Sequence, residues 1–186
     1  MRAGLITLST AIDERSAGFH ALGRSSASGV ATAVITTSGT AVANLLPAAV
    51  EADRSSQPLL LISADRPLRL KNKGVNQTVN QEAFLAPVCR WCGSGPLDGL
   101  NAGLDHELRA LAKNAWRHLH QQPGPVHLNL PFEEPLHPDL DQQNAFWSQW
   151  NRSEPEANTP NPALWKPTSH SAAPALDPDQ AGVIVA

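Results

Sequence analysis

The chain has 186 residues, a formal net charge of −3 and 17% charged residues, a size that suits one domain of ordinary length with a tail. This balance provides no basic surface for nucleic acid or for an anionic membrane. No apolar run reaches the roughly 18 residues of a membrane-spanning helix, so we expect no membrane insertion. Two cysteines and the lack of a secretion signal in this sequence favour a cytoplasmic location.

Short, continuous apolar runs alternate with helical patterns along the first 130 residues. The runs are typical of fully buried parallel strands and cover residues 5–12, 31–36, 59–63 and 126–130. The helical patterns lie at residues 14–23, 40–53 and 104–120, with Gly23 as a plausible end and Pro47 as a bend. This alternation predicts an α/β fold, a parallel sheet with helices on both faces.

The composition changes after about residue 131. Residues 133–180 hold eight of the sixteen prolines, together with Trp147, Trp150 and Trp165. Proline at this density is typical of a linker, and the tryptophans indicate that the linker packs on something. The run "AGVIVA" resembles the opening strand of another domain. We therefore predict an incomplete domain at residues 1–136, a linker at 137–180 and a first strand at 181–186, all within a fragment of a longer protein.

The first predicted strand runs directly into the first predicted helix, and three charged residues occupy the junction: Asp13, Glu14 and Arg15. In one interpretation Glu14 is a first-turn residue favoured by the helix dipole, with Asp13 as N-cap. In the other, Glu14 is held in an apolar site at a strand end, where loss of water fits a carboxyl group for proton transfer. Ligands bind at the carboxyl ends of strands in open α/β sheets. The residues alone leave both interpretations open.

The stretch "TTSGTAVAN" (36–44) predicts a turn between a strand and a helix. Ser38 or Thr40 can cap this helix, and alternatively its free N–H groups can meet an anion. The chain contains neither G-x-G-x-x-G nor G-x-x-x-x-G-K-[ST], which excludes a dinucleotide fingerprint and a P-loop.

A loop rich in cations and amides follows the strand at 59–63. Within "SADRPLRLKNKGVNQTVNQ" (63–81) these side chains are Arg66, Arg69, Lys71, Lys73, Asn76, Gln77, Asn80 and Gln81. Planar donors of this kind suit the recognition of a small molecule that bears carboxylates, and a merely solvated loop is the alternative.

The pair in "CRWC" (89–92) has C-x-x-C spacing, but no second pair completes a zinc site. A thioredoxin-type motif leads into a helix, whereas glycine and proline follow here. We therefore interpret Cys89 and Cys92 as packed, reduced cysteines. The seven histidines are scattered, so we assign no metal ligands to this chain.

Three stretches together resemble one enzyme family: "DERSAGFHALG", "VITTSGTAVANLLPAAVEA" and "LLLISADRPLRLKNKGVNQTVNQ". With "GPVHLNLPFEEPL" closing the domain, most of residues 4–136 resembles the N-terminal part of the 2-succinyl-5-enolpyruvyl-6-hydroxy-3-cyclohexene-1-carboxylate synthases. The resemblance implies a transferase of menaquinone or phylloquinone biosynthesis that depends on thiamine diphosphate and on Mg2+ or Mn2+. Such an enzyme decarboxylates 2-oxoglutarate and adds the succinyl unit to isochorismate, and it works as a homodimer or homotetramer.

The same resemblance assigns roles to residues of the pyrimidine-binding domain. Glu14 is the catalytic residue that hydrogen-bonds a ring nitrogen of the cofactor's aminopyrimidine. The cofactor-binding residues are Glu14, Thr36, Ser38, Gly39, Thr40 and Asn44. The substrate-binding residues are Arg66, Asn76, Gln77 and Gln81.

The chain also departs from the family pattern. It lacks a preceding Pro-Gly-Ser-Arg-Ser stretch and any "GDG" sequence, which in the family belongs to the domain that holds the metal and the diphosphate. We therefore expect this chain alone to be inactive. Two alternatives remain: another thiamine-diphosphate decarboxylase or acetolactate-type synthase, and a non-catalytic α/β interaction module. The loop from Arg66 to Gln77 argues against the first alternative, and Glu14 argues against the second.

Overall fold

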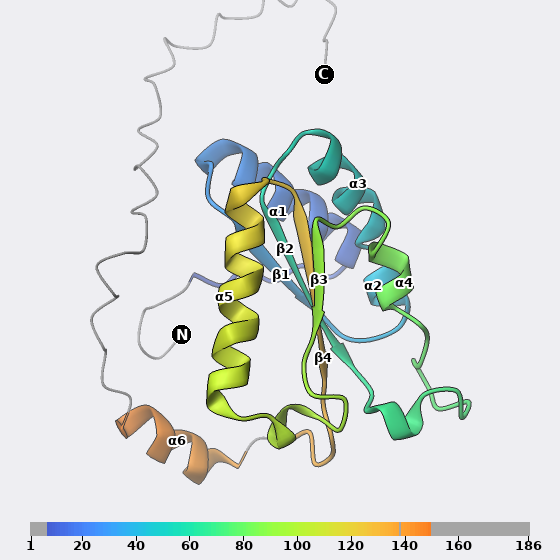
Figure 1. Ribbon diagram of the computed structural model, residues 1–186, viewed down its shortest axis with the longest axis vertical. Helices are drawn as coiled ribbons and strands as arrows, with labels where there is room; N and C mark the ends of the chain where they lie inside the picture. The colour runs from blue at the N-terminus through green and yellow to red at the C-terminus, as the bar shows by residue number, and fades with distance from the viewer. Residues whose placement is uncertain (1–6, 138, 150–186) are drawn as a thin grey trace, which may run out of the picture.

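Four parallel strands form the centre of the protein, and a computed structural model describes residues 7–137 and 139–149 (Figure 1). The strands pair in the order β1–β2–β4–β3, so β2 and β4 lie inside the sheet. Their bounds are β1 (Thr32–Thr36), β2 (Leu59–Asp65), β3 (Trp91–Ser94) and β4 (Pro125–Pro131). In register, Leu59 of β2 lies beside Thr32 on one side and Pro125 on the other.

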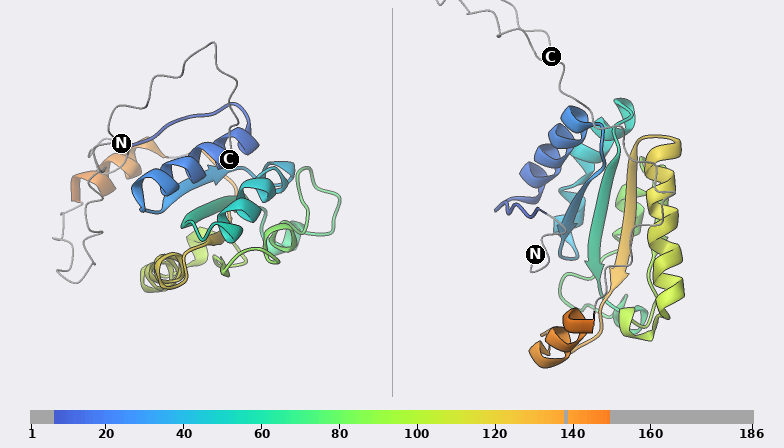
Figure 2. Two further views of the ribbon diagram at one scale, coloured as in Figure 1. Left: turned by 90° about the horizontal axis from the view of Figure 1, so that it is seen from above. Right: turned by 90° about the vertical axis from the view of Figure 1, so that its left-hand side faces the viewer.

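Helices cover both faces of the sheet, which confirms the predicted fold class. Figure 2 shows α1 and α3 on one face and α5 on the other. The α-helices are α1 (Glu14–Ser28), α2 (Thr40–Ala43), α3 (Leu46–Arg54), α4 (Glu82–Leu85), α5 (Asp105–Gln121) and α6 (Leu140–Gln149). Two short 3-10 helices are η1 (Leu68–Leu70) and η2 (Leu100–Ala102). None of the helices in the described ranges is long and apolar enough to cross a membrane.

The alternation of side chains along β2 divides the core into two clusters. Leu59 and Leu61 pack with alanines of α3 on one face, and Leu60 and Ile62 pack toward α5 on the other. Each leucine buried in this way contributes roughly 1.5–3 kcal/mol, so both faces hold the sheet together. On the α3 face the same alternation then continues with polar residues, Ser63 and Asp65, which are also buried.

The strand predicted at residues 5–12 is absent from the described part of that stretch. Residues 7–12 form no strand, Leu8 is 51% exposed and Ile12 is fully exposed. The sheet ends at β1, where Ile35, on the face opposite α1, is 70% exposed. A further strand beside β1 would therefore have no apolar cover on that face. Pairing of residues 7–12 with β1 would bury little of their apolar surface and so would contribute little stability.

Helix boundaries also differ from the sequence prediction. Helix α1 continues past Gly23 and ends at Gly29, whose φ of 68° is the left-handed conformation that a helix end favours. The predicted helix at 40–53 is split into α2 and α3, with Pro47 in the first turn of α3, where its missing N–H costs nothing.

The sequence predicts neither strand β3 nor helix α6, nor the short helices α4, η1 and η2. Strand β3 was missed, because its four residues include glycine and serine and have little strand character. Helix α6 lies inside the predicted linker, while the predicted strand at 181–186 and Trp150 and Trp165 lie outside the described residues.

Candidate functional site

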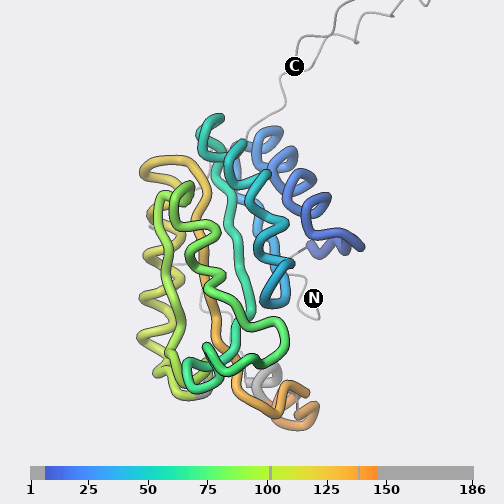
Figure 3. Tube along the Cα trace, turned by 90° about the vertical axis from the view of Figure 1, so that its right-hand side faces the viewer, coloured from blue at the N-terminus to red at the C-terminus, as the bar shows by residue number. Residues whose placement is uncertain are grey.

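The candidate site lies at the carboxyl edge of the sheet, where the ends of β1, β2 and β4 meet the start of α1. Parallel strands bring their carboxyl ends to one edge, and ligands of open α/β sheets bind there. The turn after β1 and the loop after β2 both begin at this edge (Figure 3). Most of the residues that the sequence singled out belong to these two segments.

Glu14 is the first residue of α1, as the predicted helix has it, but residues 7–12 before it form no strand, so the apolar strand end of the second interpretation is absent. Asp13 is the N-cap, as predicted, and its carboxylate accepts a hydrogen bond from the Ser16 N–H at 2.8 Å. This hydrogen bond lowers the pKa of Asp13, because it favours the charged carboxylate. Glu14 itself is half-buried, and its Oε2 accepts a hydrogen bond from Asn44 Nδ2 at 3.4 Å. The structure thus brings together two of the predicted cofactor-binding residues.

Gly39 forms the turn between β1 and α2. Its φ is 82°, a conformation that favours glycine, and a Cβ placed there would lie 3.3 Å from Cβ of Gln77. No side chain caps α2, so the alternative in which Ser38 or Thr40 caps this helix is wrong. Instead, the Gly39 N–H donates to Oε1 of Gln81 at 3.0 Å. Both glutamines of the loop after β2 therefore contact this turn.

Gln81 is completely buried, and its amide is engaged at both ends. While its oxygen accepts from Gly39, its nitrogen donates to the Ala64 carbonyl at 2.8 Å and to Asn129 Oδ1 at 2.6 Å. The same nitrogen lies 3.2 Å from Ser63 Oγ. Gln81 therefore joins the Gly39 turn to the ends of β2 and β4.

A second polar cluster surrounds Asp65, the last residue of β2. The Lys71 ammonium lies 2.6 Å from Asp65 Oδ2 and 2.8 Å from Glu82 Oε1, and Asn129 donates to both carboxylates. Burial opposes the charge of Lys71, but the hydrogen bonds to Asp65 and Glu82 raise its pKa above the ordinary value. Lys71 is consequently committed to the protein and not free for a ligand.

Arg69 is occupied in the same manner, because its Nε donates to Glu133 Oε2 at 2.9 Å. This contact raises the pKa of Arg69 and lowers the pKa of Glu133. Both side chains are exposed, and exposed ion pairs of this kind contribute little to stability.

Arg66 differs from these two cations. Its backbone N–H donates to Asp65 Oδ1 at 2.7 Å, but its side-chain Nε is buried and has no hydrogen-bond partner. Leaving a buried donor unpaired costs roughly 1–3 kcal/mol, and more for a charged group. Among the described residues, the other buried side-chain atoms without a partner are Thr36 Oγ1 and His127 Nδ1. Two of the three thus belong to predicted site residues at the strand ends.

Asn76 and Gln77 are exposed near the tip of the loop. The φ of Gln77 is 57°, an uncommon conformation for a residue with a side chain, and it costs of order 1–2 kcal/mol. Contact with Gly39 holds Gln77 in this place. Ser38 is buried within the turn, and Thr40 is exposed at the start of α2.

Sequence reasoning missed the buried polar residues Ser63, Asp65, His127 and Asn129 and the partly buried Glu82. A signal was available, because "LLLISAD" and "VHLNL" place polar residues at alternate positions of otherwise apolar strands. Such residues share one face of the sheet, and buried polar groups need partners. In the structure, Ser63 meets both His127 Nε2 at 2.8 Å and Asn129 Oδ1 at 3.0 Å.

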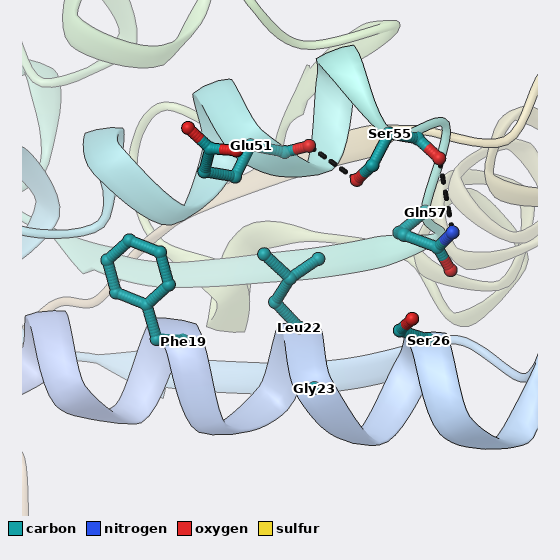
Figure 4. Close-up of a pocket in the computed structure, with 7 residues that line it drawn as sticks. All are labelled: Phe19, Leu22, Gly23, Ser26, Glu51, Ser55 and Gln57. Atoms are coloured by element: carbon teal, nitrogen blue, oxygen red, sulfur yellow. Dashed lines mark hydrogen bonds between the residues drawn. The ribbon is translucent and has the colours of Figure 1, made fainter. Parts of the chain in front are cut away.

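A groove of about 490 Å³ between α1 and α3 lies elsewhere (Figure 4). It is lined by Phe19, Leu22, Gly23, Ser26, Glu51, Ser55 and Gln57. Gln57 precedes the first residue of β2, so this groove is at the amino edge of the sheet. It contains none of the predicted site residues, and we do not assign it a ligand.

Comparison with known proteins shows what the chain is similar to. Residues 1–84 match the model of a family described as thiamine pyrophosphate enzyme, N-terminal TPP binding domain. Over all 186 residues the chain is 90% identical to the 2-succinyl-5-enolpyruvyl-6-hydroxy-3-cyclohexene-1-carboxylate synthase of Synechococcus sp. (strain CC9311). Residues 1–84 are thus similar to the N-terminal domain of thiamine pyrophosphate enzymes. The matched segment includes Glu14, Gly39, Arg66 and Gln81, which lie at the carboxyl edge of the sheet.

Other relatives with the same name are also similar to this chain. The chain is 55% identical over 192 aligned positions to the synthase of Prochlorococcus marinus (strain MIT 9303) and 61% identical over 186 positions to that of Parasynechococcus marenigrum (strain WH8102). These alignments cover 100% and 98% of the chain. The chain spans about a third of the length of these curated relatives, 32% for Synechococcus and 33% for the other two.

Proposed function

We propose that the whole protein is a thiamine-diphosphate-dependent synthase of menaquinone or phylloquinone biosynthesis. It decarboxylates 2-oxoglutarate and transfers the succinyl unit to isochorismate, which gives 2-succinyl-5-enolpyruvyl-6-hydroxy-3-cyclohexene-1-carboxylate and carbon dioxide. The observation that carries the proposal is the contact of Glu14 with Asn44 inside the segment that matches the TPP-binding family. The names of the relatives support the choice of reaction.

The residues at the carboxyl edge fit the pyrimidine part of this cofactor. Glu14 offers a half-buried carboxylate, Thr36 offers a buried hydroxyl without a partner, and Gly39 leaves the turn free of a side chain. When bound, thiamine diphosphate supplies the nucleophilic carbon and the electron sink that decarboxylation of a 2-oxo acid requires. The protein positions the cofactor and tunes its protonation.

In this proposal Glu14 holds a proton at a ring nitrogen of the aminopyrimidine. The Asn44 amide donates to Oε2 and so orients the carboxyl group, and Oε1 would be the oxygen available to the ring nitrogen. Such positioned proton transfer contributes roughly 10²–10⁴-fold to a rate. Ser38 and Thr40, which flank Gly39 in the turn after β1, are the other residues proposed to bind the cofactor.

Arg66 is proposed to bind a carboxylate of isochorismate, with Asn76 and Gln77 as further donors. The partnerless Nε of Arg66 supports this role, because a carboxylate would satisfy it with a charge-assisted hydrogen bond. Lys71 and Arg69 are occupied by carboxylates of the protein, so Arg66 is the better candidate. A dicarboxylate such as isochorismate suits this loop better than pyruvate, the substrate of acetolactate-type enzymes.

Gln81 was predicted to bind substrate, and its buried, fully engaged amide supports a positioning role instead. It anchors the Gly39 turn, and through this turn it sets the place of Thr36, Ser38 and Thr40. Its contribution to binding is then indirect.

The described residues hold no group of three or more His, Cys, Asp or Glu side chains suited to a metal ion. We propose that Mg2+ or Mn2+ is bound with the diphosphate by another part of the whole protein. We further propose a homodimer or homotetramer in the cytoplasm, with the site completed between subunits.

The test is a carboligation assay with the whole protein. Formation of the succinylated product, followed by mass spectrometry, is expected from 2-oxoglutarate and isochorismate with thiamine diphosphate and magnesium. Pyruvate in place of 2-oxoglutarate serves as the control. Acetolactate formation from pyruvate, with no product from isochorismate, would contradict the proposed substrates.

A further inference from the structure

Cys89 and Cys92 lie where the segment after α4 enters the edge strand β3. Cys89 is half-buried against the core, and its N–H donates to the Leu85 carbonyl at 3.0 Å. Cys92 is exposed, so the interpretation of both cysteines as packed is wrong for this one. The pair thus joins a sheltered thiol to an accessible one.

His127 faces Cys92 from the neighbouring strand. The two residues are partners in the β3–β4 register, and partners in adjacent strands project to the same face of a sheet. His127 is completely buried, and its Nε2 is engaged by Ser63 Oγ at 2.8 Å. Its Nδ1 has no hydrogen-bond partner in the described structure. The buried imidazole of His127 therefore projects to the same face of the sheet as Cys92.

The groups around the two thiols shift their pKa values in opposite directions, which favours Cys92 as the nucleophile and keeps the proton on Cys89. The pKa of Cys92 is lowered to about 5, mainly because the Cys89 thiol donates a hydrogen bond to its sulfur, and secondarily because of His127. The same contact raises the pKa of Cys89, and burial raises it further. Glu82 and Asp53 also face the pair and oppose negative charge on Cys92 and Cys89, respectively. The lowered pKa favours the thiolate of Cys92, the form of cysteine that reacts.

We propose that Cys89 and Cys92 form a redox-active dithiol that is oxidised by exchange with a disulfide. The Cys92 thiolate attacks one sulfur of the oxidant, which forms a mixed disulfide and releases one thiolate. The Cys89 sulfur then attacks Cys92 Sγ, passes its proton to the second departing thiolate and closes the intramolecular bond. The pair loses two electrons, and the oxidant disulfide is reduced to two thiols.

The disulfide between Cys89 and Cys92 would affect the candidate site. It ties β3 to the segment after α4, and it removes the thiolate that lies beside His127. His127 contacts Ser63, Ser63 contacts Gln81, and Gln81 holds the Gly39 turn. Oxidation is therefore transmitted to that turn along hydrogen bonds. The inference rests on contacts within this chain and not on the proposed reaction.

The experiment treats the 186-residue chain with glutathione disulfide and follows the product by intact mass. The wild type is expected to lose two hydrogens, with Cys89 and Cys92 joined in the peptide map. Cys89→Ser is expected to stop at a mixed disulfide on Cys92, and Cys92→Ser is expected not to react. Cys89→Ala repeats the first variant with an apolar residue, and circular dichroism verifies that each variant is folded.

A second arm measures the rate of alkylation of Cys92 by iodoacetamide as a function of pH, in the Cys89-containing chain. The midpoint is expected near 5. His127→Gln is expected to raise it by about one pH unit or more, because the imidazole no longer lies beside the sulfur. His118→Gln is the matched control, since His118 stacks on Trp91 on the opposite face of β3 and is expected to leave the midpoint unchanged.

Two results would overturn the proposal. One is a wild-type chain that stays reduced or stops at the mixed disulfide. The other is an alkylation midpoint near the free-thiol value of about 8.5.

Discussion

Replacing Arg66 by methionine removes the guanidinium but keeps an apolar stem of similar length. In the structure the Arg66 Nε is buried without a hydrogen-bond partner, and the proposal assigns this donor to a substrate carboxylate. A charge-assisted hydrogen bond contributes roughly 1.5–3 kcal/mol, which corresponds to about a ten- to hundred-fold rise in KM for isochorismate. The measurement is steady-state kinetics of the whole protein with isochorismate varied at saturating 2-oxoglutarate.

The matched control is Arg69→Met, three residues further along the same loop. Arg69 is exposed and already paired with Glu133, so its replacement is expected to change KM for isochorismate less than about threefold.

Thermal unfolding of the chain separates binding from a structural role. Because Arg66 Nε has no partner in the folded protein, Arg66→Met is expected to keep or raise Tm. An unchanged KM together with a lower Tm would refute the reasoning, since Arg66 would then serve stability rather than binding.

Two further predictions concern the buried network. Gln81→Leu removes the acceptor of the Gly39 N–H and one of the two donors to Asn129 Oδ1, so KM for thiamine diphosphate should rise. Gln81→Glu keeps the acceptor toward Gly39 and should recover part of the affinity. Equal losses in both variants would contradict anchoring of the turn. Lys71→Met leaves the buried Asp65 carboxylate without its cation. It is expected to lower the free energy of unfolding, measured by urea denaturation, by roughly 3 kcal/mol at neutral pH. Because the folded pKa of Lys71 is raised, its stabilisation is complete below its unfolded pKa of about 10.4 and is lost as pH rises through the folded value. The wild type should therefore lose stability at high pH, and the variant should not show this loss.

The sheet and its helices were predictable because the apolar runs and helical periods are strong local signals. The run at 59–63 predicts β2, and the periodic leucines between 104 and 120 predict α5. Residues 7–12 carry the same apolar signal and form no strand, because cover by neighbouring elements decides whether such a run is buried. Strand β3 shows the opposite case, since pairing with β4 creates a strand that local propensity does not favour.

For the candidate site, the segments were predictable and the connections between them were not. The sequence identified Glu14, the Gly39 turn and the loop after β2, all of which border the carboxyl edge of the sheet. It did not reveal that Gln81 spans from Gly39 to Asn129, because that contact joins residues 42 and 48 positions away from Gln81 along the chain. Nor did it distinguish the occupied cations Arg69 and Lys71 from Arg66, since ion pairing depends on tertiary structure.

The central claim is that Glu14 meets a ring nitrogen of the cofactor, and Glu14→Gln tests it most directly. The substitution keeps the shape and the contact with Asn44 but removes the carboxyl group that holds the proton. The measurement is hydrogen–deuterium exchange of the thiazolium proton of bound thiamine diphosphate in the whole protein, followed by NMR in deuterated water. The account predicts exchange slowed by roughly 10²–10⁴-fold in Glu14→Gln, with Asp13→Asn near the wild-type rate. Wild-type exchange in Glu14→Gln would contradict it and would leave Glu14 as a helix-start residue only.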